Sequence, residues 1–184
     1  MRLWVIVGWL GLSWFVAGWV HADTIGLYAD SQGVQCNLVD NAGAVLPIYV
    51  VHVSSAGSAG CQFSAPKPAC MVGAIWLTDV VPFFELGNTQ VGVTFGYGTC
   101  KTGPIHVTTM IFFGYGTSEP CCQYPVLPDP YAPQNEVLVV ECDNEVVAAG
   151  GLVGIVNGNA SCPCGYPVAV EETTWGNVKA LYQE

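Results

Sequence analysis

The cysteines are the feature that most constrains how this chain can fold. There are nine of them, all after residue 35, and an apolar leader precedes them. In an exported chain the default state of cysteine is the disulfide, so we expect a framework of covalent cross-links. Because nine is odd, at least one thiol is free, intermolecular or modified, and sequence alone does not reveal the connectivity. The disulfide candidates are Cys36, Cys61, Cys70, Cys100, Cys121, Cys122, Cys142, Cys162 and Cys164.

The N-terminal leader predicts export. Arg2 supplies a positive charge, residues 3–19 are apolar, and small or branched residues at 20–22 precede Asp23. This order of charge, apolar run and cleavage site is typical of a signal peptide. The alternative is an uncleaved membrane anchor, for which the apolar run is at the short limit. We therefore expect a signal peptide over 1–22, no membrane span after its cleavage, and a secreted, periplasmic or cell-surface protein.

The charge balance excludes two classes of partner. The chain carries 14 acidic residues against four basic ones, a net charge of −10. An acidic protein is a poor electrostatic match for nucleic acid and for an anionic membrane surface. We therefore expect no nucleic-acid binding. The acidity does not name a partner; we expect a protein or a glycan at the cell surface.

Short apolar or alternating runs, separated by turn residues, predict an all-β domain. Residues 91–97 and 105–113 alternate along a strand, whereas 47–53 is apolar on both faces, as a central strand would be. Glycine and proline punctuate these runs, and no segment before the tail has a convincing helical period. We expect a disulfide-stapled, antiparallel two-sheet sandwich over residues 23–165. The expected strands are 24–28, 47–53, 74–81, 91–97, 105–113, 137–142 and 152–156.

The pentapeptide FGYGT occurs twice, at residues 95–99 and 113–117. A phosphate-binding loop needs a following helix and an adjacent Gly-Lys pair, and neither copy has them. Each copy instead ends an alternating run, so its aromatic residues are expected on the inward side of a strand. Its glycines then lie where another backbone approaches or where a bulge forms. We expect the copies to be neighbouring strands of one hairpin with residues 101–104 in the turn, unless their similarity is chance.

The aromatic residues of both copies have a second interpretation. If they face solvent, they form a platform on which a ligand ring can stack. A carbohydrate-binding module would need Tyr97, Tyr115 or Trp76 in a coplanar exposed row, and burial of these rings would remove the idea. The ligand-stacking candidates are Phe95, Tyr97, Phe113 and Tyr115.

The run YPVLPDPYAP, residues 124–133, predicts a rigid extended connection that crosses from one sheet to the other. An exposed proline-rich ligand segment is the alternative. The C-terminal arm, residues 166–184, differs from the rest, because Thr173 and Thr174 are suitable N-caps for a short helix. Such a helix is marginal alone and must dock on its own domain or on a partner. Its apolar side supplies the partner-contact candidates Trp175, Val178, Leu181 and Tyr182.

No metal or redox motif is present among the cysteine pairs. The sequences Cys121-Cys122 and Cys162-Pro163-Cys164 lack the spacing of a structural zinc site and of a redox C-x-x-C motif. Disulfide staples are the expected role, with separate partners for the adjacent cysteines because a ring between neighbours is strained. We expect no cofactor. Calcium is the metal that loop carboxylates of an exported sandwich would hold, but no D-x-D-x-D-G loop occurs. The densest acidic cluster is Glu141-Cys142-Asp143-Asn144-Glu145, which we interpret as a solvated hairpin turn.

Two histidines follow the leader. His52 lies in an apolar run, which favours a satisfied core histidine, whereas His106 falls on the polar side of its strand. A hydrolase would need His106 within hydrogen-bond reach of a serine, a cysteine or a carboxylate in a cleft. Neither G-x-S-x-G nor H-E-x-x-H occurs. We therefore expect a non-catalytic structural or binding module, with the carbohydrate-binding module and then the hydrolase as alternatives.

Several short motifs together resemble a family of uncharacterised, exported, cysteine-rich β-sandwich proteins of environmental bacteria. The resemblance covers most of the chain after residue 22 and is most specific in the TWG-NVK-ALY tail. The family has no activity to carry over, and this chain ends in Gln183-Glu184 where such tails usually end in a basic residue. More loosely, the strand layout is similar to cohesin-like and immunoglobulin-like sandwiches. The matching residues are Ile25-Gly26-Leu27-Tyr28, Cys36, Pro128-Asp129-Pro130, Cys162, Cys164, Trp175, Lys179 and Leu181-Tyr182.

Overall fold

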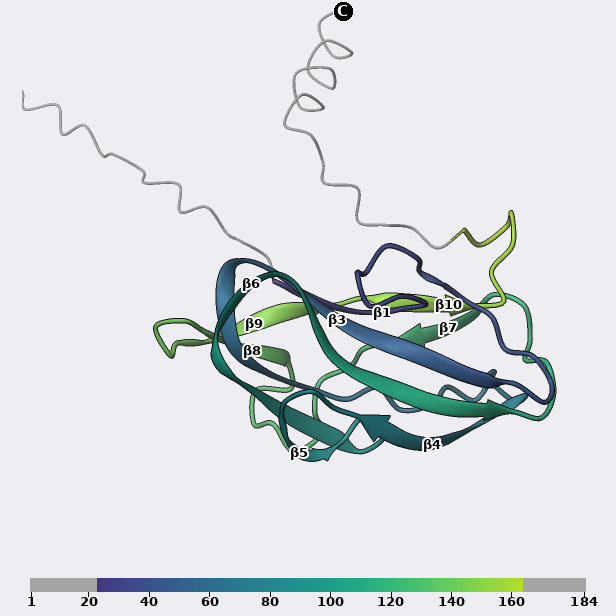
Figure 1. Ribbon diagram of the computed structural model, residues 1–184, viewed down its shortest axis with the longest axis horizontal. Helices are drawn as coiled ribbons and strands as arrows, with labels where there is room; N and C mark the ends of the chain where they lie inside the picture. Colours follow the sequence, from purple (N-terminus) through teal and green to yellow (C-terminus); the bar gives the residue numbers. More distant parts are fainter. Residues whose placement is uncertain (1–22, 164–184) are drawn as a thin grey trace, which may run out of the picture.

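Residues 23–163, the part of the chain that the computed structural model describes, form ten β-strands and no helix (Figure 1). The expected strands all overlap these elements, while β2, β5, β7 and β9 were not expected. The predicted signal peptide and the C-terminal arm with its helix lie outside the described residues. The strands are β1 (Thr24–Tyr28), β2 (Asn37–Leu38), β3 (Val45–Phe63), β4 (Ala74–Val80), β5 (Phe84–Asn88), β6 (Gly92–Gly114), β7 (Cys122–Pro125), β8 (Val137–Glu141), β9 (Val146–Gly151) and β10 (Val153–Val156).

The strands form two layers. The larger sheet has seven strands in the order β1-β9-β8-β3-β6-β4, with β5 also paired to β6. The smaller sheet has three strands in the order β2-β10-β7. Most neighbours are antiparallel, while β1 with β9 and β2 with β10 run parallel. The all-β sandwich is therefore confirmed. Within residues 23–163 no helix is long and apolar enough to cross a lipid bilayer.

The long β3–β6 pair corrects the expected hairpin. The first FGYGT copy lies within β6 and the second begins in its last two residues, and β6 runs without a turn through residues 101–104. The reason is that β3 supplies a partner along that stretch, with Lys101 opposite Ser58 and Pro104 opposite Val53. Register shifts near Ser58 bend the pair instead of reversing it. A bend made by bulges keeps the backbone paired where a turn would end the ladder.

The second FGYGT copy faces the opposite way from the first. Phe95 and Tyr97 are buried, as expected, but Phe113 is 40% exposed and Phe112 is fully buried. A register shift in the β3–β6 pairing explains why the two copies face opposite ways. Val50 pairs with Thr108 while its neighbour Val51 pairs with His106, so β6 has one extra residue at this point. The extra β6 residue at this shift reverses the alternation downstream. The expectation that Phe113 and Tyr115 point inward is therefore wrong, and Tyr115 is 63% exposed.

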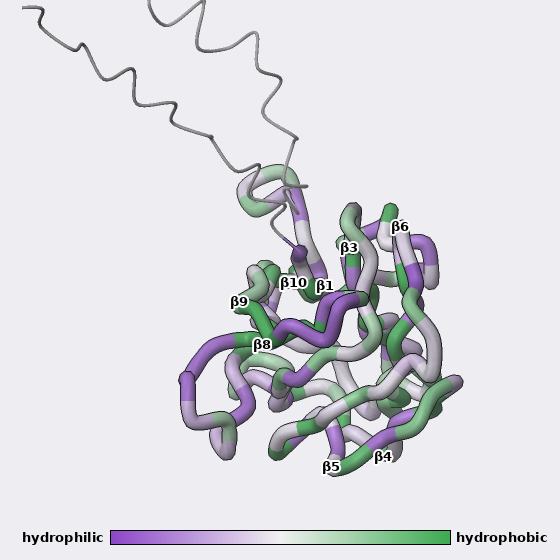
Figure 2. The backbone as a smooth tube through the Cα atoms, turned by 90° about the vertical axis from the view of Figure 1, so that its left-hand side faces the viewer, coloured by the Kyte–Doolittle hydropathy of each residue, from purple (hydrophilic) through white to green (hydrophobic). Residues whose placement is uncertain are grey.

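The core lies between the two sheets and is rich in aromatic rings. Phe63 stacks on Phe95 with ring centroids 5.8 Å apart, and Phe112 meets Tyr124 edge-on at 6.2 Å. The hydroxyl of buried Tyr124 donates a hydrogen bond to the carbonyl of Ala65 at 2.8 Å, so its polar atom is satisfied. Figure 2 shows apolar residues running along the strands and polar residues collecting in the connecting loops.

Three disulfides connect the described residues: Cys70–Cys122, Cys100–Cys142 and Cys121–Cys162. Adjacent Cys121 and Cys122 thus have separate partners, as expected. Cys36 is disulfide-bonded as well. Cys164 lies outside the described residues.

Cys61 is not a disulfide cysteine, which corrects its place among the candidates. Its thiol is free and the residue is only 1% exposed. It lies near the end of β3, between Phe95 on β6 and Val139 on β8, where it packs as a small apolar residue. Burial raises the pKa of the Cys61 thiol to about 12, so the group stays protonated.

The proline-rich connection runs from β7 in the small sheet to β8 in the large sheet, as predicted. Asp129 anchors it, because its carboxylate accepts hydrogen bonds from the side-chain amide of Gln62 and from the backbone amide of Tyr131, both at 2.8 Å. Ser64 and Leu127 form an isolated antiparallel bridge nearby. These bonds hold the connection against β3.

Candidate functional site

An exposed apolar row crosses three neighbouring strands of the large sheet. Phe113 on β6 lies directly opposite Val45 on β3 and Ile75 on β4. The three side chains are 40%, 60% and 51% exposed respectively. Cross-strand partners on one face have Cβ atoms about 5 Å apart, so the three form a continuous strip. We call Val45, Phe113 and Ile75 the apolar row.

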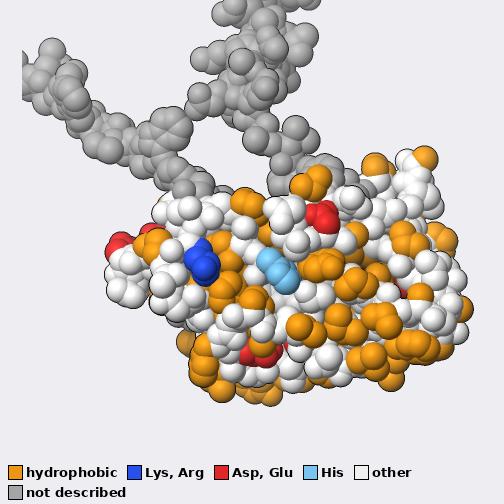
Figure 3. All heavy atoms as spheres, viewed as in Figure 1, with side chains coloured by type: hydrophobic (Ala, Val, Ile, Leu, Met, Phe, Trp, Pro, Cys, Tyr) orange, Lys and Arg blue, Asp and Glu red, His pale blue; other side chains and the backbone are white. Residues whose placement is uncertain are grey.

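The apolar row opens onto a larger apolar surface, which we call the β3–β6–β4 face. Ile111 pairs with Pro47 and Thr78 on its two sides, and one step further Thr109 pairs with Tyr49 and Val80. Leu77, in the β4 bulge, is 51% exposed. Figure 3 shows apolar side chains gathered over this part of the molecule. The face consists of the apolar row with Pro47, Tyr49, Leu77, Val80 and Ile111.

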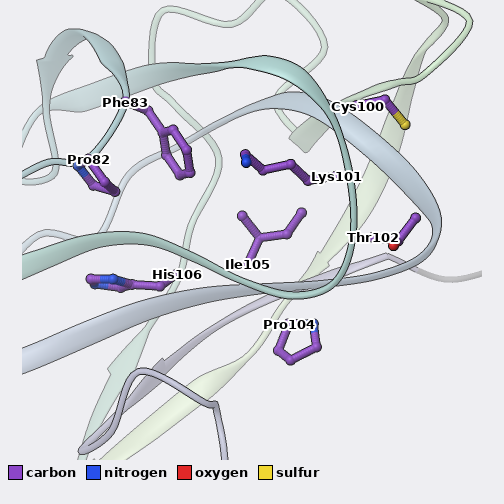
Figure 4. Close-up of a pocket in the computed structure, with 8 residues that line it drawn as sticks. All are labelled: Pro82, Phe83, Cys100, Lys101, Thr102, Pro104, Ile105 and His106. Carbon is purple, nitrogen blue, oxygen red and sulfur yellow. The ribbon is translucent and has the colours of Figure 1, made fainter.

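A hollow of about 550 Å³ lies beyond Tyr49, where β6 bends and the β4–β5 connection passes. Figure 4 shows the Lys101 side chain extending over Ile105 toward Phe83. The Lys101 ammonium lies 5.4 Å from the centroid of the Phe83 ring, and that ring packs on Tyr97 with centroids 5.0 Å apart. The cation thus stacks on an aromatic ring that the core holds in place. The hollow is lined by Pro82, Phe83, Cys100, Lys101, Thr102, Pro104, Ile105 and His106.

His106 does not meet the requirement for a catalytic base. Its Nε2 atom lies 2.8 Å from the hydroxyl of Thr109, and its ring packs against Tyr49 with centroids 5.4 Å apart. Burial lowers the pKa of His106, and a backbone hydrogen bond with Thr108 opposes that shift. Cys100 also lines the hollow, but its sulfur is bonded to Cys142. Among residues 23–163, no serine, free cysteine or carboxylate hydrogen-bonds to this imidazole.

The aromatic platform expected for sugar stacking does not form. Phe95 and Tyr97 are buried, at 1% and 4% exposure. Trp76 is half-buried, and its indole N–H donates to the carboxylate of Asp79 at 3.1 Å. Phe113 belongs to the apolar row, and Tyr115 is exposed beyond the end of β6. The carbohydrate-binding interpretation needed Tyr97, Tyr115 or Trp76 in a coplanar exposed row, and of these three rings Tyr115 is the one that is exposed.

His52 is a satisfied core histidine, as expected. It is fully buried, with Nδ1 2.9 Å from the hydroxyl of Tyr97 and Nε2 3.3 Å from a carboxylate oxygen of Asp23. Burial lowers the pKa of His52, while the charge of Asp23 opposes the shift. These polar groups hold β1, β3 and β6 together and present nothing to a ligand.

The acidic cluster sits in the β8–β9 hairpin turn. Carboxylate oxygens of Glu141, Asp143 and Glu145 lie within 4.8 Å of one another. The turn explains their proximity, since the amide of Asn144 donates to the carbonyl of Glu141 at 3.0 Å and Asn144 has a φ of 72°. Within residues 23–163 these are the side chains that could hold a metal ion. An ordinary solvated hairpin turn would place the three carboxylates in the same way.

Most of the β3–β6–β4 face was not identified from the sequence. Phe113 was a candidate, but Ile75, Leu77 and Val80 were read simply as strand residues. Val45 lay outside the expected strand 47–53. The available signal was the excess of apolar residues on both sides of 74–81. Interpreting that excess requires knowing which strands are neighbours and which face a second layer covers. The candidates Trp175, Val178, Leu181 and Tyr182 lie outside the described residues.

No known protein family and no curated protein matches the sequence, but twelve chains of solved structures match the fold. A type I cohesin of Clostridium thermocellum, solved in complex with a dockerin, has a TM-score of 0.51 at 10% identity, over 75% of this chain and 99% of that chain. A type II cohesin of Acetivibrio cellulolyticus has a TM-score of 0.49 at 10% identity, over 74% and 95%. A cohesin of Pseudobacteroides cellulosolvens reaches 0.47 at 12%, over 79% and 97%. The chain is therefore an all-β sandwich with a fold similar to that of cohesin modules.

Proposed function

We propose that this protein is a non-catalytic, protein-binding module whose docking surface is the β3–β6–β4 face. The apolar row carries the proposal. Three large apolar side chains on adjacent strands, each at least 40% exposed, form a contiguous strip. Contiguous exposed apolar surface of this kind marks an interaction site more often than scattered single residues do.

In the proposed mechanism, binding is driven by the burial of apolar side chains, and no covalent step takes place. Covering an apolar side chain that is already half-exposed contributes about 1 kcal/mol, so the row offers roughly 3 kcal/mol before its neighbours are counted. Extensive backbone pairing in β3 and β6 holds the strip in place, so little conformational entropy is lost on binding. The partner is a protein that presents apolar side chains. The Clostridium thermocellum cohesin with the similar fold was solved with a protein partner, a dockerin, which supports a protein as the occupant.

The proposed location is the cell surface or the medium. Three disulfides require an oxidising compartment, and the predicted signal peptide would deliver the chain there. The net charge of −10 disfavours nucleic acid as an alternative partner. We propose no cofactor for this role, because burial of apolar surface needs none.

The test compares matched surface variants. The immobilised protein, its Phe113→Ser/Ile75→Ser variant and its Val146→Ser variant are exposed to the secreted and envelope proteins of the source organism. Val146 is an exposed valine on β9, away from the face. A true partner is retained by the unmodified protein and by Val146→Ser, and the purified partner binds the double variant at least tenfold more weakly. Equal affinity for all three proteins would exclude the face as the docking surface.

A further inference from the structure

Lys101 is a positive charge in the hollow that no described carboxylate neutralises. After residue 22 the chain has three lysines and no arginine, and two of these lysines, Lys67 and Lys101, are described. Lys67 is satisfied, because its ammonium donates to the carbonyl of Met71 at 2.7 Å. Lys101 has no carboxylate of the described chain within 4.0 Å, and its ammonium lies against the face of the Phe83 ring. An ammonium carries three N–H donors, so one placed against a ring still has donors to offer to an anion.

We infer that this hollow is a binding site for a carboxylate carried on an apolar group, and that the carboxylate pairs with Lys101. The site lies outside the apolar row and goes beyond the proposed docking function. Two sources offer this chemistry: a free organic acid, and an acidic side chain of a protein that covers the neighbouring face. The hollow adjoins that face, because the ring of His106 in the hollow packs against Tyr49.

The hollow has the size and the walls of a ligand site. Its volume of about 550 Å³ falls within the range of roughly 300–1,000 Å³ that small-ligand pockets occupy. Ile105 lines it and is 5% exposed, and Pro82, Phe83 and Pro104 supply further apolar surface. No aspartate or glutamate is among the described residues that line it, so a carboxylate meets no like charge at the wall.

The lysine is positioned before any ligand arrives. Its backbone pairs with Ser58 of β3, and the preceding residue, Cys100, is bonded to Cys142. Figure 4 shows its side chain directed toward Phe83, and the ammonium lies 5.4 Å from the centroid of that ring. A charge held in this way loses little conformational freedom when a ligand binds.

His106 contributes a wall but no charge. Its Nε2 atom lies 2.8 Å from the hydroxyl of Thr109, and the ring also takes part in a backbone hydrogen bond with Thr108. Burial lowers the pKa of His106, so the imidazole is neutral at pH 7. The hollow therefore offers a single positive charge, which one carboxylate balances. A phosphate dianion would leave a negative charge unpaired beside apolar walls, in a chain whose net charge is already −10.

The test uses 3-phenylpropionate as the probe and its neutral amide, 3-phenylpropanamide, as the matched control. Both are titrated into the processed chain while the backbone amide signals are followed by two-dimensional NMR. The carboxylate should shift the signals of Lys101, Ile105 and His106, and the shifts should saturate. The neutral amide should shift the same signals and bind about fivefold more weakly, since a partly exposed ion pair contributes a modest gain.

Variants of Lys101 separate its charge from the shape of the hollow. Lys101→Met keeps an unbranched apolar side chain and should bind 3-phenylpropionate about fivefold more weakly than the unmodified chain does. Its affinity for the neutral amide should be unchanged, which shows that the hollow is intact. Lys101→Arg keeps the charge and should retain the preference for the carboxylate. Lys67→Met makes the same change in net charge outside the hollow and should alter neither affinity.

A protein bound to the β3–β6–β4 face distinguishes the two sources of the carboxylate. If its own acidic side chain occupies the hollow, Lys101→Met lowers its affinity and 3-phenylpropionate competes with it. If a free organic acid occupies the hollow, the protein and the probe bind together, and Lys101→Met leaves the affinity of the protein unchanged. Both results support a carboxylate site in the hollow.

Three results would overturn the inference. They are the absence of saturable shifts at Lys101, Ile105 and His106, equal affinity for the two probes, and a preference for the carboxylate that persists in Lys101→Met. None of them depends on the proposed function, because Phe113→Ser/Ile75→Ser should bind 3-phenylpropionate as the unmodified chain does. Partner affinity in that double variant tests the face, whereas probe affinity in Lys101→Met tests the hollow.

Discussion

The hydroxyl of Tyr97 lies 2.9 Å from Nδ1 of His52 in the interior of the sandwich. The opposite ring nitrogen of His52 faces the carboxylate of Asp23 at 3.3 Å. Tyr97 lies on β6 and His52 on β3, and Asp23 directly precedes β1, so one polar chain connects these parts of the large sheet. Buried polar groups stabilise a fold only when each finds its partner, which makes every member of this chain sensitive to substitution.

Replacing Tyr97 tests this network directly. Tyr97→Phe keeps the ring but leaves Nδ1 of His52 without its hydroxyl partner, which should lower the free energy of unfolding by about 1–3 kcal/mol. Urea denaturation monitored by circular dichroism measures the change. Tyr115→Phe is the matched control, because Tyr115 occupies the same place in the second FGYGT copy and is exposed. Equal stability of the two variants would show that the His52 contact contributes nothing.

Stability should also depend on pH through His52. Burial holds the pKa of His52 below the ordinary value of 6.5, so the unfolded chain binds a proton at a higher pH than the native chain does. The free energy of unfolding is then highest above about pH 6.5 and declines as the pH falls below it. The decline continues until the native imidazole is itself protonated. Urea titrations between about pH 5 and 7.5 measure this slope.

His52→Gln should flatten that slope, whatever it does to absolute stability. His106→Gln is the control, because burial lowers the pKa of His106 as well but leaves that ring half-buried on the surface. We expect the larger loss of slope in His52→Gln. An unchanged slope in that variant would assign the pH dependence to other groups.

The strand pattern identified the architecture but not the direction of every side chain. The residue types of Ile105, Val107, Ile111 and Phe113 alternate as if they shared one face. The shift opposite Val50 and Val51 breaks that alternation, and a bulge of one residue leaves no mark in hydrophobic periodicity. The identical pentapeptides therefore have opposite environments, with Tyr97 in the core and Tyr115 in solvent. Local sequence could not separate them, because the difference is made by the partner strand.

For the cysteines too, some properties could be predicted from the sequence and others depend on the three-dimensional fold. The number of cysteines and the expected export predicted disulfides, and the odd count predicted at least one cysteine that is free, intermolecular or modified; Cys61 is the free one among the described residues. Choosing which thiol is unpaired requires Cα distances that depend on the whole topology. Cys61 lies on the inward side of β3, where no other cysteine of residues 23–163 is bonded to it, and nothing in its sequence neighbourhood distinguishes it from Cys70.

Cys61 should resist alkylation in the native protein. It is 1% exposed and its pKa is raised to about 12, so neither access nor thiolate is available. Iodoacetamide in guanidinium without reductant should modify Cys61, while Cys70 and Cys122 stay unmodified because they are bonded to each other. Peptide mass spectrometry reads all three sites. Modification of Cys61 in the absence of denaturant would contradict its position in the core.

The glycines of the two FGYGT copies offer a matched pair of substitutions. A Cβ added to Gly114 would collide with the backbone oxygen of Asn41, whereas one added to Gly96 would meet no atom within 4 Å. Gly114→Ala should therefore lower the free energy of unfolding by about 1–3 kcal/mol through overpacking. Gly96→Ala should be neutral or stabilising by up to about 1 kcal/mol, because alanine restricts the unfolded chain. The urea midpoints of the two variants measure these changes. If both midpoints shift with the same sign and size, the close backbone of Asn41 is not the reason for the glycine at position 114.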